Sequence, residues 1–248
     1  MPINVWTVTV AAAFTALATG LGALPFLFVR GGVGSRWLGV SNAIAAGFMC
    51  AASVGLIWQG VDLGPGRVVL GALAGGVFIW IFRRLIGQRE NLVLGRLAGA
   101  DALKALVIVG VMTVHSASEG VGVGVSYGGG ERLGLLITIA IAAHNVPEGL
   151  AISLVLVPRG ASVRSAAWWS VFSSLPQPLI APFAYLFVES FKPVLPAGLG
   201  FAAGAMLWMV WSELLPEALE DAPRRSLALG GGISFAVMLA AQVLLFGS

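Results

Sequence analysis

Apolar residues in this chain occur in long runs separated by short polar loops. A helix needs about 20 apolar residues to cross the ~30 Å hydrocarbon core of a bilayer, and most runs reach that length. The pattern predicts an all-α polytopic membrane protein with eight transmembrane helices, at residues 5–29, 37–61, 67–82, 105–127, 133–157, 165–188, 193–213 and 226–247. The third run is short because Arg83 and Arg84 end it; an earlier start near Leu63, or arginines that extend their charges to the membrane surface, would lengthen it.

The composition agrees with a membrane protein and leaves no room for a separate soluble domain. The chain is 58% hydrophobic and 10% charged, with a mean hydropathy of +0.95, whereas soluble domains carry about 25% charged residues. We therefore expect residues 1–248 to form one transmembrane domain, with 86–104 as a cytoplasmic loop. The N-terminal MPINVW has no basic region before its apolar run, so no cleavable signal is expected.

Lysine and arginine are distributed unevenly between alternate loops. The even loops hold Arg67, Arg132 and Lys192, whereas the odd loops hold Arg30, Arg36, Arg83, Arg84, Arg89, Arg96, Lys104, Arg159, Arg164, Arg224 and Arg225. Because cytoplasmic loops are enriched in these residues, the odd loops are predicted to face the cytoplasm and both termini to lie outside it. We expect an integral protein of the cell (inner) membrane whose +3 net charge reflects topology, with no nucleic-acid partner.

The two histidines of the chain each precede a glutamate by four residues inside an apolar run. The segments are TVHSASEG, with His115 and Glu119, and AAHNVPEG, with His144 and Glu148. Residues four apart share one face of a helix, and a carboxylate inside a bilayer is costly unless something offsets it. Two such faces set against each other form a pocket of two imidazoles and two carboxylates, which is a ligand set for a divalent transition metal.

The two motifs lie on consecutive helices, which run antiparallel and are therefore related as inverted repeats. At ~1.5 Å per residue, both histidines are predicted to lie about 18 Å below the outer surface, near the midplane. Straight helices would place Glu119 outward and Glu148 inward of the histidines. One ion would then not easily touch all four side chains, so either the helices slip in register or there are two ion positions.

Three further polar residues are candidate neighbours of the ion, each with a structural alternative. Asn145 points away from His144 on the same helix, toward either a second site or a helix–helix hydrogen bond. Gln177 lies among prolines in a broken polar segment of the kind that lines cavities; it is either a weak neutral ligand or a structural hydrogen-bonding group. Glu213, toward the cytoplasmic end of the seventh run, is either an exit ligand or part of a solvated helix end.

These residues resemble those of the ZIP family (Zrt-, Irt-like proteins) of divalent metal transporters, most closely its prokaryotic GufA-type branch. The resemblance rests on the helix count and topology, on HSASEG and HNVPEG, on the proline-flanked Gln177, and on FAAGAMLWMVWSELLPEA in the seventh run. It implies an elevator-type carrier, in which the first, fourth, fifth and sixth helices slide against the other four. Members of the family carry zinc, iron, manganese or cadmium into the cytoplasm.

The resemblance also implies roles for single residues. The primary metal site is matched by His115, Glu119, His144 and Glu148. Ser116 and Asn145 match positions of a secondary site, Gln177 matches a position that is often glutamate, and Glu213 matches an acidic position on the cytoplasmic side. Compared with the family pattern, Ser116 replaces an asparagine, Ser118 a proline and Gln177 a glutamate. Because a carboxylate is lost, we infer a site for a single metal ion.

The sequence thus predicts a transporter that moves a divalent ion into the cytoplasm. Zn²⁺ is the first expectation because His and Glu ligands suit it and the single Cys50 provides no thiolate cluster; Fe²⁺, Mn²⁺ and Cd²⁺ are the alternatives. A non-transporting metal-binding homologue or sensor is the first rival. An intramembrane metallohydrolase is the second, although the HEXXH arrangement is absent. The expected partners are the ion and the lipid bilayer, and the abundant glycines permit a homodimer without requiring one.

Overall fold

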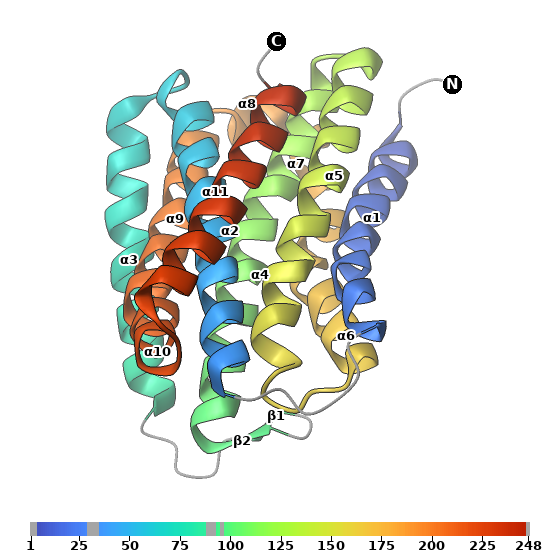
Figure 1. The fold of residues 1–248 in the computed structure, drawn as a ribbon. Helices are drawn as coiled ribbons and strands as arrows, with labels where there is room; N and C mark the ends of the chain where they lie inside the picture. Colours follow the sequence, from blue (N-terminus) through green and yellow to red (C-terminus); the bar gives the residue numbers. More distant parts are fainter. Residues whose placement is uncertain (1–3, 29–34, 88–92, 95–96, 247–248) are drawn as a thin grey trace.

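The protein is a bundle of helices that run roughly along one common direction (Figure 1). The computed structural model describes residues 4–28, 35–87, 93–94 and 97–246. Its elements, in chain order, are α1 (Val5–Gly20), the 3₁₀ helix η1 (Leu21–Leu27), α2 (Ser35–Val61), α3 (Pro65–Gly87), β1 (Val93–Leu94), β2 (Leu97–Ala98), α4 (Gly99–Gly128), α5 (Glu131–Leu156), α6 (Val163–Ser174), α7 (Pro176–Leu186), α8 (Val188–Phe191), α9 (Leu195–Met209), the π-helix η2 (Val210–Leu214), α10 (Leu215–Asp221) and α11 (Arg224–Phe246).

Seven helices among the described residues are long and apolar enough to cross a membrane. This finding confirms the prediction of an all-α polytopic membrane protein, but it does not confirm the count of eight. The predicted segment 165–188 is the one that is missing, because the chain breaks at Leu175 into α6 and α7. The break falls directly before Pro176, whose ring fixes its backbone and which has no N–H to donate to the preceding turn.

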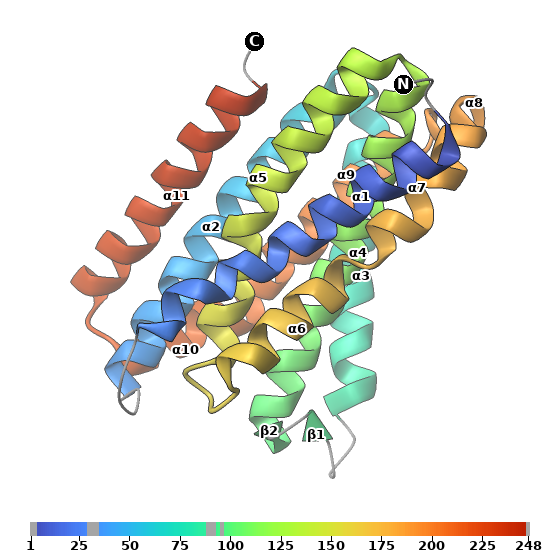
Figure 2. The same ribbon diagram turned by 90° about the vertical axis from the view of Figure 1, so that its right-hand side faces the viewer.

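The two halves of this broken segment still follow one another along the bundle. Figure 2 shows α6 and α7 end to end, and both pack against α1 and α4. The chain begins α1 and finishes α11 at the same end of the bundle, which we call the terminal end (Figure 1). The antiparallel β1–β2 pair lies at the opposite end, which we call the hairpin end.

The third helix is longer than the apolar run that predicted it. α3 begins at Pro65 and continues through Arg83 and Arg84 to Gly87. The Arg83 guanidinium forms an ion pair with the Glu213 carboxylate, and the Arg84 guanidinium lies 5.5 Å from the ring centre of Trp80, so neither charge has to end the helix.

The predicted loop 86–104 is occupied in part by regular structure. α4 starts at Gly99, and Val93–Leu94 pair with Leu97–Ala98. The remainder of that loop, with Arg89 and Arg96, lies outside the described residues, as does Arg30 in the first loop.

The helices pack as two groups. The motif group contains α1, α4, α5, α6 and α7, with extensive α4–α7, α1–α5 and α1–α7 packing. The flanking group contains α2, α3, α9, α10 and α11, with extensive α3–α9, α2–α11 and α2–α9 packing. The groups meet chiefly where α2 packs on α5 and α4 packs on α9.

Glycines bring the helices closer within each group than between the groups. A Cβ atom on Gly75 of α3 would lie 2.0 Å from the Phe201 carbonyl oxygen of α9, and one on Gly149 of α5 would lie 1.7 Å from the Thr19 oxygen of α1. At the α4–α9 contact, by comparison, a Cβ on Gly198 would lie 3.3 Å from the Ser118 hydroxyl oxygen. Backbones therefore touch inside each group, where only glycine fits, whereas side chains separate the two groups.

Candidate metal centre

The two sequence motifs converge in the interior of the bundle. His115 and Glu119 project from α4, and His144 and Glu148 from α5; all four side chains are buried. One ligand atom from each, a ring nitrogen or a carboxylate oxygen, lies within 4.8 Å of all the others. The His144 Nε2–Glu148 Oε1 distance is 3.1 Å and the His115 Nε2–Glu119 Oε1 distance is 3.6 Å, while His115 Nε2 also contacts Glu148 Oε1.

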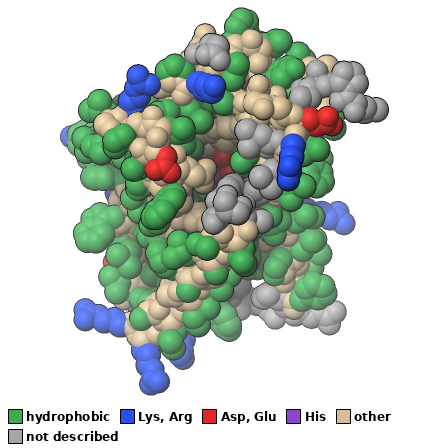
Figure 3. All heavy atoms as spheres, turned by 90° about the horizontal axis from the view of Figure 1, so that it is seen from above, with side chains coloured by type: hydrophobic (Ala, Val, Ile, Leu, Met, Phe, Trp, Pro, Cys, Tyr) green, Lys and Arg blue, Asp and Glu red, His purple; other side chains and the backbone are tan. Residues whose placement is uncertain are grey.

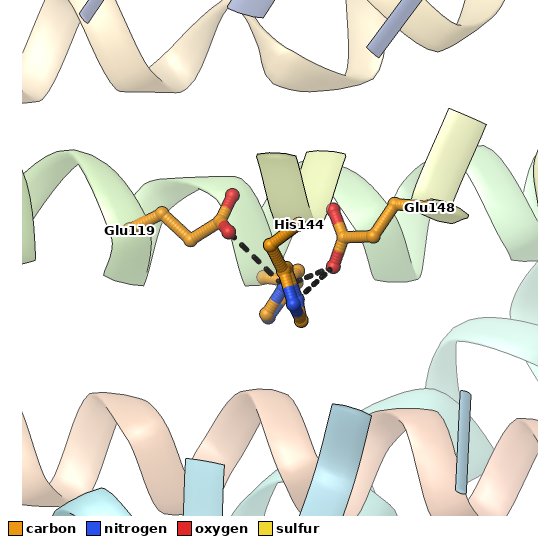
Figure 4. Close-up of side chains that lie close together, drawn as sticks. Glu119, His144 and Glu148 are labelled. Atoms are coloured by element: carbon orange, nitrogen blue, oxygen red, sulfur yellow. Dashed lines mark hydrogen bonds and ion pairs between the residues drawn. The ribbon is translucent and has the colours of Figure 1, made fainter. Parts of the chain in front are cut away.

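The two glutamates reach the histidines from opposite directions. Figure 4 shows Glu119 and Glu148 extending toward His144 from either side. The sequence argument that one ion would not easily touch all four side chains is therefore wrong, because each glutamate is long enough to bring its carboxylate back to the level of the imidazoles. The ligand atoms of a tetrahedral Zn²⁺ are about 3.3 Å apart at its usual bond lengths, so side-chain rotations that draw the four ligand atoms closer together would bring this set to one ion.

The electrostatics of this cluster favour a divalent cation. Two carboxylates are buried in the same cluster among apolar helices, where like charges repel and water does not solvate them. Two neutral imidazoles and two carboxylates carry a charge of −2, which one divalent ion would neutralise. The donor set of nitrogen and carboxylate oxygen suits zinc and its neighbours among the transition metals.

Gln177 lies beside this cluster and is hydrogen-bonded at both ends of its amide. Its Nε2 donates to Glu119 Oε2 at 2.5 Å, and its Oε1 accepts from Thr15 Oγ1 at 2.5 Å and from Asn145 Nδ2 at 3.2 Å. Asn145 Nδ2 also donates to the Thr15 carbonyl oxygen at 2.7 Å. The structure thus gives Asn145 the interhelical hydrogen bonds that were one of its two predicted roles, and it directs the amide nitrogen of Gln177, not its oxygen, toward the ligand set.

Two further predicted residues lie outside the cluster of four. Ser116 is buried, and its hydroxyl has no hydrogen-bond partner among the described residues. Glu213 is in the π-helix η2, buried, and paired with Arg83.

Glu213 belongs to a group of six charged residues at the hairpin end that sequence reasoning did not connect. We call this group the ion-pair network; its members are Arg83, Asp101, Lys104, Arg159, Glu213 and Glu217. Glu217 pairs with both Lys104 and Arg159, and the Arg159 Nε–Asp101 Oδ1 distance is 3.4 Å. The sequence treats the three bases only as topology signals; the one clue to partners is that Glu213 and Glu217 share a helix face.

Arg159 is the central cation of this network. Its side chain is only 1% exposed, and it also donates to the Val155 carbonyl oxygen at 2.7 Å. Burial lowers the pKa of the Arg159 guanidinium to about 10, while Asp101, Asp221 and Glu213 act in the opposite direction. The guanidinium therefore keeps its charge at neutral pH and can hold Glu217.

A cavity of about 480 Å³ connects the cluster to the terminal end. Glu119 and His144 line it at depth, and Gly129 and Lys192 line it near the turns of the terminal end. Most of its remaining wall is apolar and comes from both helix groups. Figure 3, which looks onto the terminal end, shows the surface hollowed near its centre. Among the described residues that line this cavity, none belongs to the ion-pair network.

Comparison with known proteins agrees with this architecture. The family profile described as ZIP Zinc transporter matches residues 95–240. The zinc transporter GufA of Myxococcus xanthus is 32% identical over 235 residues, which cover 89% of this chain and 92% of that protein, and the zinc transporter ZIPB of Bordetella bronchiseptica is 33% identical over 90% of this chain and 76% of its own length. A provisionally named zinc transporter of Arabidopsis thaliana is 46% identical over 98% of this chain, but the chain spans only 39% of the plant protein.

The profile matches more than half of the chain, and GufA matches along almost the whole length of both proteins. The resemblance expected from HSASEG, HNVPEG and the seventh apolar run is confirmed: the chain belongs to the ZIP family.

Proposed function

We propose that this protein transports a divalent transition-metal ion across a membrane, with Zn²⁺ as its main substrate. The observation that carries the proposal is the convergence of two imidazoles and two carboxylates within 4.8 Å, buried between apolar helices at the depth of a cavity. The relatives are named as zinc transporters, not as enzymes, which supports the same activity.

His115, Glu119, His144 and Glu148 are the proposed ligands. Each must be deprotonated at its ligand atom to bind a metal, so binding releases protons and weakens as the pH falls. Nitrogen and carboxylate ligands without a thiolate favour Zn²⁺, with Fe²⁺, Mn²⁺ and Cd²⁺ as competitors. We further propose that the site lies near the membrane midplane.

The proposed orientation places the terminal end outside the cytoplasm. The start of α1 and the end of α11 lie there, and the broken α6–α7 segment is the proposed eighth span, which makes the number of crossings even. The excess of lysine and arginine at the hairpin end supports a cytoplasmic location for that end. The cavity then opens outward, and a divalent ion released at the hairpin end gains about 2.3 kcal/mol per charge for every 100 mV of membrane potential.

An elevator-type movement is the proposed transport mechanism. In it, the motif group carries the ion-binding residues past the flanking group. The packing supports this division, because backbones touch through glycines such as Gly75 and Gly149 within each group, while the Gly198–Ser118 contact between the groups is at side-chain distance. The α2–α5 and α4–α9 surfaces are the ones that would slide.

A metal-binding homologue that does not transport is the alternative favoured by a specific observation. Gln177 stands where the family pattern often has glutamate, and its amide oxygen is occupied by Thr15 and Asn145. A receptor or sensor would bind the ion at the buried cluster without moving the motif group past the flanking group.

Zinc uptake into proteoliposomes distinguishes these functions. The purified chain is reconstituted, and ⁶⁵Zn²⁺ uptake is measured for the unmodified protein, for His144→Ala and for Ser53→Ala, a buried polar control in the flanking group. We expect uptake by the unmodified chain and the control, inhibition by excess Cd²⁺, Fe²⁺ or Mn²⁺ in an order that gives the selectivity, and loss of uptake in His144→Ala. Zinc binding without uptake would support the sensor, and unchanged uptake in His144→Ala would refute the proposed site.

A further inference from the structure

The hydrogen bonds around Gln177 form a chain with a defined direction. An amide nitrogen only donates, and a carbonyl oxygen only accepts. Asn145 Nδ2 donates to the Thr15 carbonyl oxygen, and the same nitrogen faces the Gln177 amide. The atom of Gln177 on that side must therefore be its accepting oxygen, Oε1. The Nε2 of Gln177 then has to face Glu119 Oε2.

This chain of hydrogen bonds connects three helices to one carboxylate oxygen on a fourth helix. Thr15 comes from α1, Asn145 from α5, Gln177 from α7 and Glu119 from α4; the first three are 0% exposed. Gly120 reinforces the contact, because a Cβ there would lie 2.9 Å from the Gln177 carbonyl oxygen, so α4 and α7 meet at backbone distance beside the site. With Oε2 of Glu119 engaged by the amide, Oε1 is the oxygen that faces His115.

The amide nitrogen contacts the carboxylate oxygen of Glu119 that is not paired with His115. It presents a partial positive charge to Glu119 without adding net charge to the site. The ligand set therefore keeps a charge of −2, which matches one divalent ion and leaves no excess to hold another.

We propose that Gln177 is the positioning residue for Glu119, and that the Thr15–Asn145–Gln177 chain takes the place of a second cation and restricts the site to a single ion. This inference rests on the proposed function for its consequence in metal binding. The contact between Gln177 and Glu119 can be tested in the metal-free protein.

The first measurement is infrared difference spectroscopy on the metal-free, full-length protein. Glu119→Gln identifies the carboxylate band of Glu119. Gln177→Met, which keeps the length of the side chain and removes the N–H, is expected to shift that band, whereas Ser173→Ala, a buried neighbour that donates only to the Ser170 carbonyl oxygen among the described residues, is expected to leave it unchanged. An unshifted Glu119 band in Gln177→Met would overturn the positioning role, whether or not the protein binds zinc.

The second measurement is equilibrium dialysis of the detergent-purified variants against ⁶⁵Zn²⁺. We expect one Zn²⁺ per chain for the unmodified protein and for Ser173→Ala, and one Zn²⁺ bound about 10- to 100-fold more weakly for Gln177→Met, as for other residues that orient a ligand. Gln177→Glu adds a negative charge and is expected to bind two ions per chain. A purely structural role for Gln177 would change stability but not this stoichiometry.

The possible failures are distinct. If the unmodified chain binds no zinc, the proposed function is wrong, and the infrared result alone decides the Gln177–Glu119 contact. If the unmodified chain already binds two ions, or if Gln177→Glu still binds one, the replacement of a second cation by the amide is refuted, while the proposed transport function is unaffected.

Discussion

The two ends of the molecule are built in opposite ways. At the terminal end, a largely apolar cavity separates the helix groups and reaches down to Glu119 and His144. At the hairpin end, Glu217 of the flanking group forms ion pairs with Lys104 and Arg159. Lys104 lies in α4 of the motif group, and Arg159 lies in the loop directly after α5 of the same group. The same two groups are thus apart at one end and joined by charge at the other.

This difference indicates how one bundle can expose a buried cluster at its terminal end while it holds its helix groups together at the hairpin end. The apolar walls of the cavity attract a cation weakly, but no ion pair has to break when these walls move together. The ion pairs of the network, by contrast, hold two helix surfaces against each other, because separating them would leave partly buried charges unpaired. In the proposed orientation, the cavity would open to the outside and the ion-pair network would lie on the cytoplasmic side.

The cluster at the floor of the cavity should be the most sensitive point. Glu148→Gln keeps the shape of the side chain and removes the charge that both histidines contact. Because even residues that only orient ligands contribute 10- to 100-fold to affinity, we expect zinc affinity to fall by at least about 100-fold, measured by equilibrium dialysis. Glu220→Gln, the same change on an exposed residue, serves as the control and should bind zinc normally. Retained affinity in Glu148→Gln would move the binding site elsewhere.

The ion-pair network should be the next most sensitive. Glu217→Gln leaves Lys104 and Arg159 without their shared carboxylate in a partly buried environment. Breaking a fully buried pair costs more, but with Glu217 21% exposed we expect a loss of about 2 kcal/mol in the free energy of unfolding. Thermal unfolding measures this loss, and amide hydrogen exchange should increase in α10 and at the start of α4 but not in the turns of the terminal end.

Glu220→Gln is again the matched control, since it makes the same change on the same helix. An equal loss of stability in the control, or faster exchange spread evenly over both ends, would show that the network does not join the helix groups locally.

The width of the cavity should have a smaller effect, and on rate only. Gly122 lines the cavity, and a Cβ there would meet nothing within 4 Å. Gly122→Leu therefore fills open space on a helix that tolerates leucine. We expect several-fold slower ⁶⁵Zn²⁺ uptake into proteoliposomes, with the amount of zinc bound at equilibrium unchanged. Slower uptake together with weaker binding would mean that the substitution reaches the ligands and does not simply narrow the path.

The sequence predicts those features that depend on spacing and composition. His115 with Glu119 and His144 with Glu148 could be paired because four residues return a helix to the same face. The break at Leu175 is foreshadowed by Pro176 in a polar stretch. The expectation that one ion would not easily touch all four side chains was wrong because it considered only the positions of the residues along straight helices and neglected the length of the glutamate side chains.

The features that the sequence does not predict depend on which distant residues meet. Gln177 bonds to Thr15, which is 162 positions away, and nothing in the local pattern of either residue identifies the other as its partner. Lys104 and Glu217 are 113 positions apart, and their signs alone do not say that they pair. The π-helix η2, which contains Glu213, adds a local change of winding that hydrophobic patterning does not reveal.

The charge at the mouth of the cavity should have the smallest effect. Lys192 is an exposed cation among the lining residues, at the end from which a divalent ion would approach in the proposed orientation. It repels that ion through solvent, and salt screens the repulsion over about 8 Å at physiological ionic strength. Lys192→Gln is therefore expected to raise the initial rate of zinc uptake by roughly twofold at low salt, with the gain disappearing as salt is added.

Arg132→Gln makes the same change of charge on an exposed residue of α5 near the terminal end that does not line the cavity, and should change the rate less. If both variants increased the uptake rate equally, the rate would depend on the total charge of the terminal end and not on a charge in the cavity. The cavity would then no longer be supported as the path by which zinc reaches His144 and Glu119.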